Sequence, residues 1–389
     1  MSLDLDKSTW KRVVFGDVVR NLNVTVKDPS AEGIDQVIAM EHLDPCELKI
    51  SRWGSIEDGT TFTRRVRPGQ TLFGKRRAYQ RKAAYAEFDA ITSGDILVFE
   101  ADPTQLLSEF LPFLVQSDGF YDHALGTSAG SLSPRTNWRD LSNYEFDLPP
   151  LDEQKRLADL LWSVERHRLA VVESKVNAAA AADAYFSETL AKHAAESVPA
   201  PDLIDEMTVG VVVRPTQYYT DDRATGVPAL RGLNVLPGGF DLTDLVYFRP
   251  ESAADLQKST LQKDDVVVIR TGRPGDAAVV PAEVAGYNCI DLIIVRPGRH
   301  VDSKFVELFL NSDYGRAQIA RRSAGTAQQH FNVGAFKKIQ IPALPLNEQR
   351  ALVSATVDIQ SVSDRFADEL DRLEAVRAAM LNNIFRGAK

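Results

Sequence analysis

The chain has 389 residues, of which 44% are hydrophobic and 25% are charged, and its formal net charge is −9. No apolar run approaches the length of a membrane span, residues 1–10 are too polar for a signal peptide, and the two cysteines and six histidines show no disulfide or metal-ligand spacing. These features argue against the membrane, secreted disulfide-rich and metal-site classes, and predict a cytoplasmic globular protein with room for two cores.

The first half of the chain has the pattern of a mixed α/β unit. β-branched apolar runs predict strands, and clusters of Asp, Gly, Ser and Pro predict loops. In chain order we expect mixed or strand structure over residues 10–26, loops and short strands over 27–60, a strand near 70–73, a buried strand over 96–99, a short helix over 106–115 and a polar loop over 126–137.

A basic stretch lies in this first half. Between Gly59 and Ala86 there is no acidic residue, and Phe62, Phe73 and Tyr79 are interleaved with the cations. A solvated surface segment is the plain interpretation, but the interleaved aromatic residues favour a structured basic surface suited to nucleic acid. The basic residues concerned are Arg64, Arg65, Arg67, Lys75, Arg76, Arg77 and Arg81, followed by Lys82.

The second half repeats the order of the first. We expect a strand over residues 266–269, a turn over 270–275, a buried strand over 292–295, a helix beginning within 305–310 and a polar loop over 325–333. Arg, Gln and Asn side chains in such turns and loops can bind guanine and adenine edges through paired hydrogen bonds. The candidate DNA contacts from the turn and the two polar loops are Ser131, Arg135, Thr136, Asn137, Arg270, Arg273, Gln328, Gln329, His330 and Asn332.

A short motif occurs twice and accounts for this parallel order. Residues 150–154 read Pro-Leu-Asp-Glu-Gln, and residues 345–349, which lie 195 positions later, read Pro-Leu-Asn-Glu-Gln. The same offset aligns the strand near 70–73 with the strand over 266–269. The buried strands at 96–99 and 292–295 align only after a slip of one residue, that is, with an offset one residue larger. Two copies are too few for a solenoid and predict a pseudo-twofold molecule in which each α/β (or α+β) unit precedes a long helix.

Each motif begins one of these helices, with Asp152 and Asn347 as the expected N-caps. In the second helix, Leu352, Ile359, Phe366, Leu373 and Met380 recur every seven residues, flanked by Asp364, Arg365, Asp368, Arg372 and Arg377. In the first, the apolar residues Leu157, Leu161, Val164, Val171, Val172 and Val176 lead into an alanine-rich tract over 178–182. We therefore expect an antiparallel coiled coil, and domains over residues 1–149, 150–197, 198–344 and 345–389.

Catalysis finds little support in the sequence. The turn at 272–275 lacks the Gly-Lys-Ser/Thr ending of a phosphate-binding loop, and residues 148–151 lack the polar start and aromatic end of an amino-methyltransferase motif. Histidine is a common general base, but the residue equivalent to His330 in the first half is Arg135, so a catalytic role would exist in one half only. We therefore expect no enzymatic activity and no catalytic or metal-binding residues.

The paired motifs, the Ser-Ala-Gly-Ser/Thr sequences that precede them and the unit–helix–unit–helix order resemble the specificity subunits of type I restriction-modification enzymes over nearly the whole chain. The resemblance implies two target-recognition domains, each reading one half of a split DNA site, and a coiled coil that docks two modification subunits. Restriction or translocase subunits are further implied partners. S-adenosylmethionine, ATP and Mg²⁺ would belong to the partners. The implied subunit-interface residues are Glu153, Gln154, Leu157, Glu348, Gln349 and Leu352.

Two other interpretations remain open. A protein-binding coiled-coil scaffold without DNA readout is favoured by the acidic balance and opposed by the basic stretch. A small-molecule transferase has only His330 and scattered acidic residues in its favour.

Overall fold

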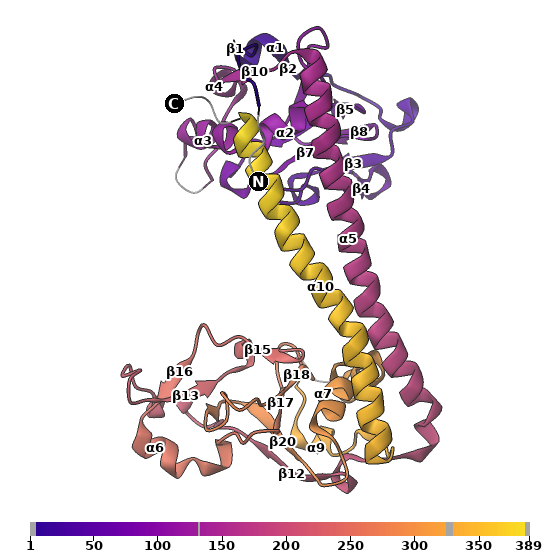
Figure 1. Cartoon of the computed structure of the whole chain (residues 1–389), viewed down its shortest axis with the longest axis vertical. Helices are drawn as coiled ribbons and strands as arrows, with labels where there is room; N and C mark the ends of the chain where they lie inside the picture. The colour runs from indigo at the N-terminus through magenta and orange to yellow at the C-terminus, as the bar shows by residue number, and fades with distance from the viewer. Residues whose placement is uncertain (1–4, 131–132, 324–329, 386–389) are drawn as a thin grey trace. The chain divides into compact units, whose positions relative to one another are not determined.

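The computed structural model describes residues 5–130, 133–323 and 330–385 (Figure 1). The chain forms two compact units, one comprising residues 1–172 with 368–389 and the other residues 173–367. Each long helix therefore contributes its two parts to different units.

The first unit is built on a four-stranded antiparallel sheet in the order β2-β9-β6-β7, beside a mixed sheet β4-β3-β8-β5 and a β1-β10 pair. Its strands are β1 Lys11–Val14, β2 Val19–Leu22, β3 Gln36–Ile38, β4 Gly54–Ser55, β5 Arg64–Val66, β6 Thr71–Gly74, β7 Ala83–Tyr85, β8 Ala90–Thr92, β9 Ile96–Ala101 and β10 Glu145–Leu148. Its helices are α1 Phe15–Val18, α2 Leu111–Val115, α3 Asp118–Gly126 and α4 Trp138–Leu141, followed by the long helix α5 Leu151–Lys192.

The second unit repeats the main sheet as β12-β20-β17-β18, with smaller sheets β16-β13-β19, β14-β15 and β11-β21. Its strands are β11 Ser197–Pro199, β12 Ile204–Val209, β13 Val227–Leu230, β14 Val235–Leu236, β15 Gly239–Phe240, β16 Val246–Phe248, β17 Val266–Ile269, β18 Ala277–Val279, β19 Asn288–Cys289, β20 Leu292–Pro297 and β21 Gln340–Pro342. Its helices are α6 Pro250–Asp255, α7 Ser303–Asn311, α8 Asp313–Ser323 and α9 Val333–Phe336, followed by α10 Leu346–Phe385.

The strand register confirms the internal repeat, including its one-residue slip. Leu72 pairs with Val98 in the first sheet, and Val267 pairs with Ile294 in the second. The first partners are 195 positions apart and the second partners 196, as the sequence alignment required. β6 and β17 are buried along their whole length, because their apolar residues face packed layers on both sides of the sheet.

The predicted helix over 106–115 is wrong in its first half, since α2 covers only Leu111–Val115. Pro112 explains the late start: proline lacks a backbone N–H and clashes with the preceding turn inside a helix, so it is tolerated only in the first turn. Residues 106–110 form turns instead, with the Leu106 N–H donating to the Asp102 carbonyl at 2.8 Å.

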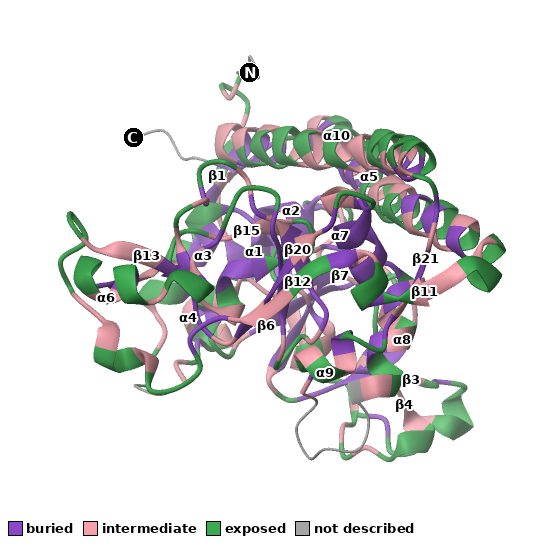
Figure 2. Ribbon diagram, turned by 90° about the horizontal axis from the view of Figure 1, so that it is seen from below, coloured by how far each residue is buried: buried purple, intermediate pink, exposed green. Residues whose placement is uncertain are grey.

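The two long helices pack together in opposite directions. In the first unit, His167 of α5 contacts Glu369 of α10 at 3.0 Å, and in the second unit the Ser363 hydroxyl donates to the Lys175 carbonyl at 3.3 Å. The five residues of the predicted heptad on α10 are all buried or half-buried, whereas many residues between them are exposed, so buried and exposed positions alternate along the helix (Figure 2). The predicted antiparallel pairing of the two long helices is therefore confirmed.

Some details of the predicted helices are corrected. Both helices begin at the leucine before Asp152 or Asn347, so these two residues lie in the first turn rather than at the N-cap. Val172 and Val176 are 36% and 61% exposed, because they lie about 100° and about 140° around α5 from the buried Val171.

A buried ion cluster joins the helices to the first unit's globular part. Glu165 accepts two hydrogen bonds from the Arg168 guanidinium, at 3.1 and 2.8 Å, and Arg168 also contacts Glu47. Arg377, predicted as an exposed flanking residue, is only 6% exposed and donates to the Cys46 carbonyl at 2.8 Å. Because unpaired buried charges are costly, this cluster fixes the two helices against the loop that contains residues 46 and 47.

Candidate nucleic-acid interface

In the first unit, the turn after β6 is hydrogen-bonded to the polar loop before α4. The Thr136 N–H donates to the Lys75 carbonyl at 3.1 Å, and the Arg77 N–H donates to the Pro134 carbonyl at 2.8 Å. These bonds place Arg76 opposite Arg135, which the sequence separates by more than fifty positions. The structure thus brings together five of the predicted DNA contacts: Lys75, Arg76, Arg77, Arg135 and Thr136.

Asp95, in the turn just before β9, organises the two opposed arginines. Its carboxylate lies 3.5 Å from the Arg76 guanidinium and 3.5 Å from that of Arg135. Arg76 also donates to the Ser133 hydroxyl at 2.8 Å, and Lys75 donates its backbone N–H to the Asp95 carbonyl. Because one carboxylate lies between two guanidiniums, the group keeps an excess of positive charge. The side chains of Arg76 and Arg135 remain 44% and 54% exposed.

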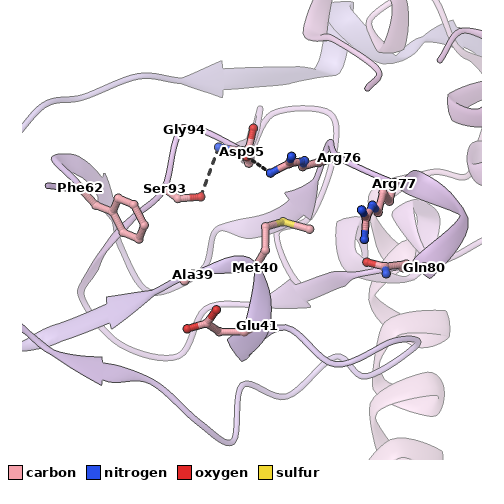
Figure 3. Close-up of a pocket in the computed structure, with 10 residues that line it drawn as sticks. All are labelled: Ala39, Met40, Glu41, Phe62, Arg76, Arg77, Gln80, Ser93, Gly94 and Asp95. Atoms are coloured by element: carbon pink, nitrogen blue, oxygen red, sulfur yellow. Dashed lines mark hydrogen bonds and ion pairs between the residues drawn. The ribbon is translucent and has the colours of Figure 1, made fainter. Parts of the chain in front are cut away.

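Beside this group lies a hollow of about 570 Å³. Figure 3 shows Arg76 held toward Asp95, while Arg77 and Gln80 lie next to one another on the same side of the hollow and Phe62 lies on the opposite side. Cationic, amide and apolar groups, with the carboxylates of Glu41 and Asp95, thus line one concave surface of the first unit.

The second unit has the equivalent arrangement with different side chains. The Phe331 N–H donates to the Arg270 carbonyl at 2.9 Å, and Thr271 lies opposite His330 as Arg76 lies opposite Arg135. Arg270 forms an ion pair with Asp291 and contacts Nε2 of His330 at 2.8 Å. The shared scaffold therefore pairs one carboxylate with two arginines in the first unit, and with the single arginine Arg270 in the second.

The contacts of His330 fix its tautomer. A guanidinium can only donate, so Nε2 of His330 accepts the bond from Arg270, and Nδ1–H donates to the Thr271 hydroxyl at 3.0 Å. The ring is thus held at both nitrogens, by Arg270 and by Thr271. This arrangement gives His330 a positioning role in the turn.

The cations of the basic stretch over residues 64–82 do not all lie on one exposed surface. Arg64 donates to the Asn23 side chain at 2.9 Å, and Arg65 forms ion pairs with Glu32 and Asp89. Burial lowers the pKa of Arg64, whereas the hydrogen bond to Asp89 raises the pKa of Arg65. These two guanidiniums are occupied within the unit and stabilise the loops around β5.

Two further cations of this stretch are also occupied. Arg81 donates to Asp118 at 2.7 Å and to the Gln116 carbonyl at 2.9 Å, and the Lys82 ammonium donates to the Met40 carbonyl at 2.7 Å. Arg67 is exposed in the turn between β5 and β6. The cations on the exposed side of the site are thus Lys75, Arg76, Arg77 and Arg135.

Several predicted loop contacts have structural roles instead. Thr136 is 1% exposed and cannot touch a ligand. Asn137 and Asn332 are the N-caps of α4 and α9, where each side-chain oxygen accepts a backbone N–H. Arg273 donates to the Val235 carbonyl at 2.9 Å and lies 3.3 Å from Asp276, so it holds its own turn. Ser131, Gln328 and Gln329 lie outside the described residues.

The sequence analysis missed a second basic group, formed by Arg321, Lys337 and Lys338 near the polar loop of the second unit. All three are exposed, and Arg322 connects the two segments by donating to the Lys338 carbonyl at 2.7 Å. The signal was present as two adjacent pairs of cations, on either side of the loop over 325–333.

The repeated motif itself has a structural explanation. Gln154 accepts the Leu107 N–H at 2.9 Å and donates to the Gln105 and Pro149 carbonyls, both at 2.8 Å. Gln349 makes the same three bonds in the second unit, with the Asp302 N–H at 2.8 Å and the His300 and Leu344 carbonyls at 3.0 and 2.8 Å. Each glutamine therefore fastens a long helix to its unit.

This result corrects part of the predicted subunit interface. Gln154, Leu157, Gln349 and Leu352 are between 0% and 5% exposed, so these side chains hold the fold and cannot contact a partner directly. Glu153 is half-buried and accepts the Trp10 indole N–H at 3.1 Å, and Glu348 is exposed.

Across residues 5–130, 133–323 and 330–385, no helix is long and apolar enough to cross a membrane. Over the same ranges, no group of three or more His, Cys, Asp or Glu side chains has an arrangement that would hold a metal ion.

Comparisons with known proteins found similar sequences over part of the chain. Residues 59–179 match the family model described as type I restriction modification DNA specificity domain. The type I restriction enzyme EcoKI specificity subunit of Escherichia coli K12 is 28% identical over 183 residues, which cover 44% of this chain and 37% of that subunit. The EcoDI specificity subunit of Escherichia coli is 27% identical over 209 residues, covering 51% of this chain and 45% of that subunit. The aligned regions thus span less than half of these relatives.

The fold itself is shared with a solved structure. A chain from a study of complex assembly and conformational transition of the type I restriction-modification system superposes with a TM-score of 0.64 at 19% identity, covering 98% of both chains. Its similarity extends across both units and both long helices, whereas the sequence matches are local. The resemblance of this chain to the specificity subunits of type I restriction-modification enzymes, first indicated by its paired helix starts, is therefore confirmed.

Proposed function

We propose that the chain is a DNA specificity subunit that recognises a bipartite, asymmetric site, with one half contacted by each unit. The observation that carries this proposal is the duplicated turn–loop site. The two units share strand register and backbone hydrogen bonds at this site, yet Arg76 and Arg135 of the first unit stand where Thr271 and His330 stand in the second. Unlike side chains on like scaffolds suit a target whose two halves differ in sequence.

The charge distribution supports contact with a phosphate backbone. Arg76 and Arg135 are exposed and share a single carboxylate, so a phosphate would meet an excess of positive charge. Arg321, Lys337 and Lys338 would supply the corresponding charge in the second unit. The net charge of −9 is compatible with DNA binding if partner subunits hold the DNA jointly with this chain.

The proposal includes partners and a division of labour. Two modification subunits would bind the chain, with restriction or translocase subunits joining them, and S-adenosylmethionine, ATP and Mg²⁺ would act in those subunits. The chain itself would carry no reaction and would work in the cytoplasm. Residues 1–149 and 198–344 would be the two target-recognition domains, and the helices over 150–197 and 345–389 would set their spacing.

The test is DNA binding by the complex with its modification subunits, measured at several salt concentrations. Replacing both Arg76 and Arg135 with alanine should weaken binding to all duplexes. The slope of log K against log salt should fall by about 0.9 for each phosphate that the variant no longer binds, because fewer counterions are released. Wild-type complex selected on random duplexes should enrich two sequence blocks at a constant spacing.

The matched control is Arg65→Ala, since Arg65 is occupied by Glu32 and Asp89 and its replacement should leave the salt slope unchanged. An equal decrease of the slope in this control would refute the assignment of the turn–loop site. Enrichment of a single sequence block would refute bipartite recognition. A complex that binds no DNA would refute the proposed function and favour the protein-binding coiled-coil scaffold instead.

A further inference from the structure

Two arginines in the first unit adopt a backbone conformation that side chains rarely take. Arg77 and Arg81 flank the short 3-10 helix Ala78–Gln80 and have φ values of 53° and 51°. The left-handed region places Cβ close to the following carbonyl and therefore costs energy for any residue except glycine. Strain of this kind persists where the surrounding structure, or the function, requires it.

For Arg81 the structure explains the strain. Its guanidinium donates to Asp118 and to the Gln116 carbonyl, and it lies 4.7 Å from the centre of the Tyr121 ring. The conformation of Arg81 is thus stabilised by contacts that join the turn to α2 and α3.

For Arg77 no such explanation is present. Its backbone is fixed, because its N–H donates to the Pro134 carbonyl at 2.8 Å and its carbonyl accepts the Gln80 N–H at 2.9 Å. Its guanidinium, however, has no hydrogen bond or ion pair to any residue in the described parts of the chain, and the side chain is exposed. Figure 3 shows it beside Gln80 at the edge of the hollow.

The equivalent turn of the second unit shows whether the fold requires a side chain at the position of Arg77. The residue of the second unit equivalent to Arg77 is Gly272, which follows Thr271 as Arg77 follows Arg76. Gly272 has a φ of 86°, and no atom lies within 4 Å of the point that a Cβ would occupy there, so the turn itself needs only glycine. The first unit therefore carries a strained arginine where the same fold is satisfied without a side chain.

We propose that Arg77, with Gln80 beside it, reads base edges in the half-site of the first unit. Arg77 would donate two hydrogen bonds to a guanine, and Gln80 would bind a neighbouring adenine. Arg76 and Arg135, which are tied to Asp95 and Ser133, would hold the phosphate backbone nearby. The fixed backbone of Arg77 suits reading because the guanidinium starts from a defined position. This inference rests on the proposed function and assigns the readers within it.

The test uses the complex with modification subunits and a random duplex pool, comparing wild type with Arg77→Gly, Arg77→Lys and Gln80→Ala. Arg77→Gly should abolish the preference at one guanine of the first half-site, a loss of roughly tenfold to a hundredfold in discrimination. It should also leave the melting temperature unchanged or raise it, because glycine relieves the strain. Arg77→Lys keeps the charge but should lose most of the same preference, because an ammonium cannot make the paired contact. Gln80→Ala should remove the preference at the neighbouring adenine and retain the guanine.

The control is Arg67→Ala, which removes another exposed arginine of the same unit that does not line the hollow. It should leave every position of the selected sequence unchanged. If Arg77→Gly and Arg77→Lys keep the wild-type sequence preference, or if Arg77→Gly weakens all duplexes equally and lowers the salt slope, Arg77 is not a reader while the proposed function stands. A wild-type complex without any sequence preference would overturn both.

Discussion

Replacing Gln154 with alanine should destabilise the first unit by about 3–5 kcal/mol. Gln154 is 0% exposed and makes three hydrogen bonds to backbone groups at the start of α5. Alanine would leave the Leu107 N–H buried without a partner, which costs about 1–3 kcal/mol, and would remove one bond from each of two carbonyls, at about 1 kcal/mol each. The missing side-chain volume adds to this cost.

The positions of the tryptophans make the effect measurable in one unit at a time. All four, Trp10, Trp53, Trp138 and Trp162, belong to the first unit. In urea titrations, tryptophan fluorescence therefore follows the first unit and far-ultraviolet circular dichroism follows both. The fluorescence transition of Gln154→Ala should move to lower urea.

The repeat provides the matched comparison. Gln349→Ala removes the same three bonds from the second unit, so it should shift the circular dichroism transition and leave the fluorescence transition in place. Lys155→Ala, which alters an exposed residue at the next position of α5, should change stability by less than about 0.5 kcal/mol. A fluorescence shift below about 1 kcal/mol for Gln154→Ala, or an equal shift for Gln349→Ala, would refute the fastening role.

Two further predictions concern buried ionisable groups. Glu165→Ala should destabilise the first unit by about 3–5 kcal/mol, because Arg168 would remain buried without the carboxylate to which it donates two hydrogen bonds. The control is Asp159→Ala, which alters an exposed carboxylate of the same helix and should have little effect in the same fluorescence titration. Burial raises the pKa of the Cys289 thiol, so maleimide should label the native protein only at the exposed Cys46, even as the pH rises to about 9. The variant Cys46→Ser should therefore show no labelling of the native protein. Rapid native labelling of Cys289 would contradict its buried position.

The sequence by itself determined the repeat, the positions of the central strands and the extents of the two long helices. These features arise from local patterns: β17 occupies the predicted apolar run, and α10 keeps its seven-residue spacing buried or half-buried. The one-residue slip between the halves was also visible, because each apolar run marks the position of its strand, and the second half has one more residue between the two paired strands.

Only the tertiary structure decided which polar residues are available for binding. Arg65 and Arg77 lie in the same basic stretch, yet Arg65 is neutralised by Glu32 and Asp89, which approach from other parts of the chain. Gln154 appears in the sequence as an exposed polar residue at a helix start, but chain segments some fifty positions away surround it. An ion pair or a buried hydrogen bond depends on the distance between atoms in space, and the sequence reveals that distance only where the partners are close along the chain.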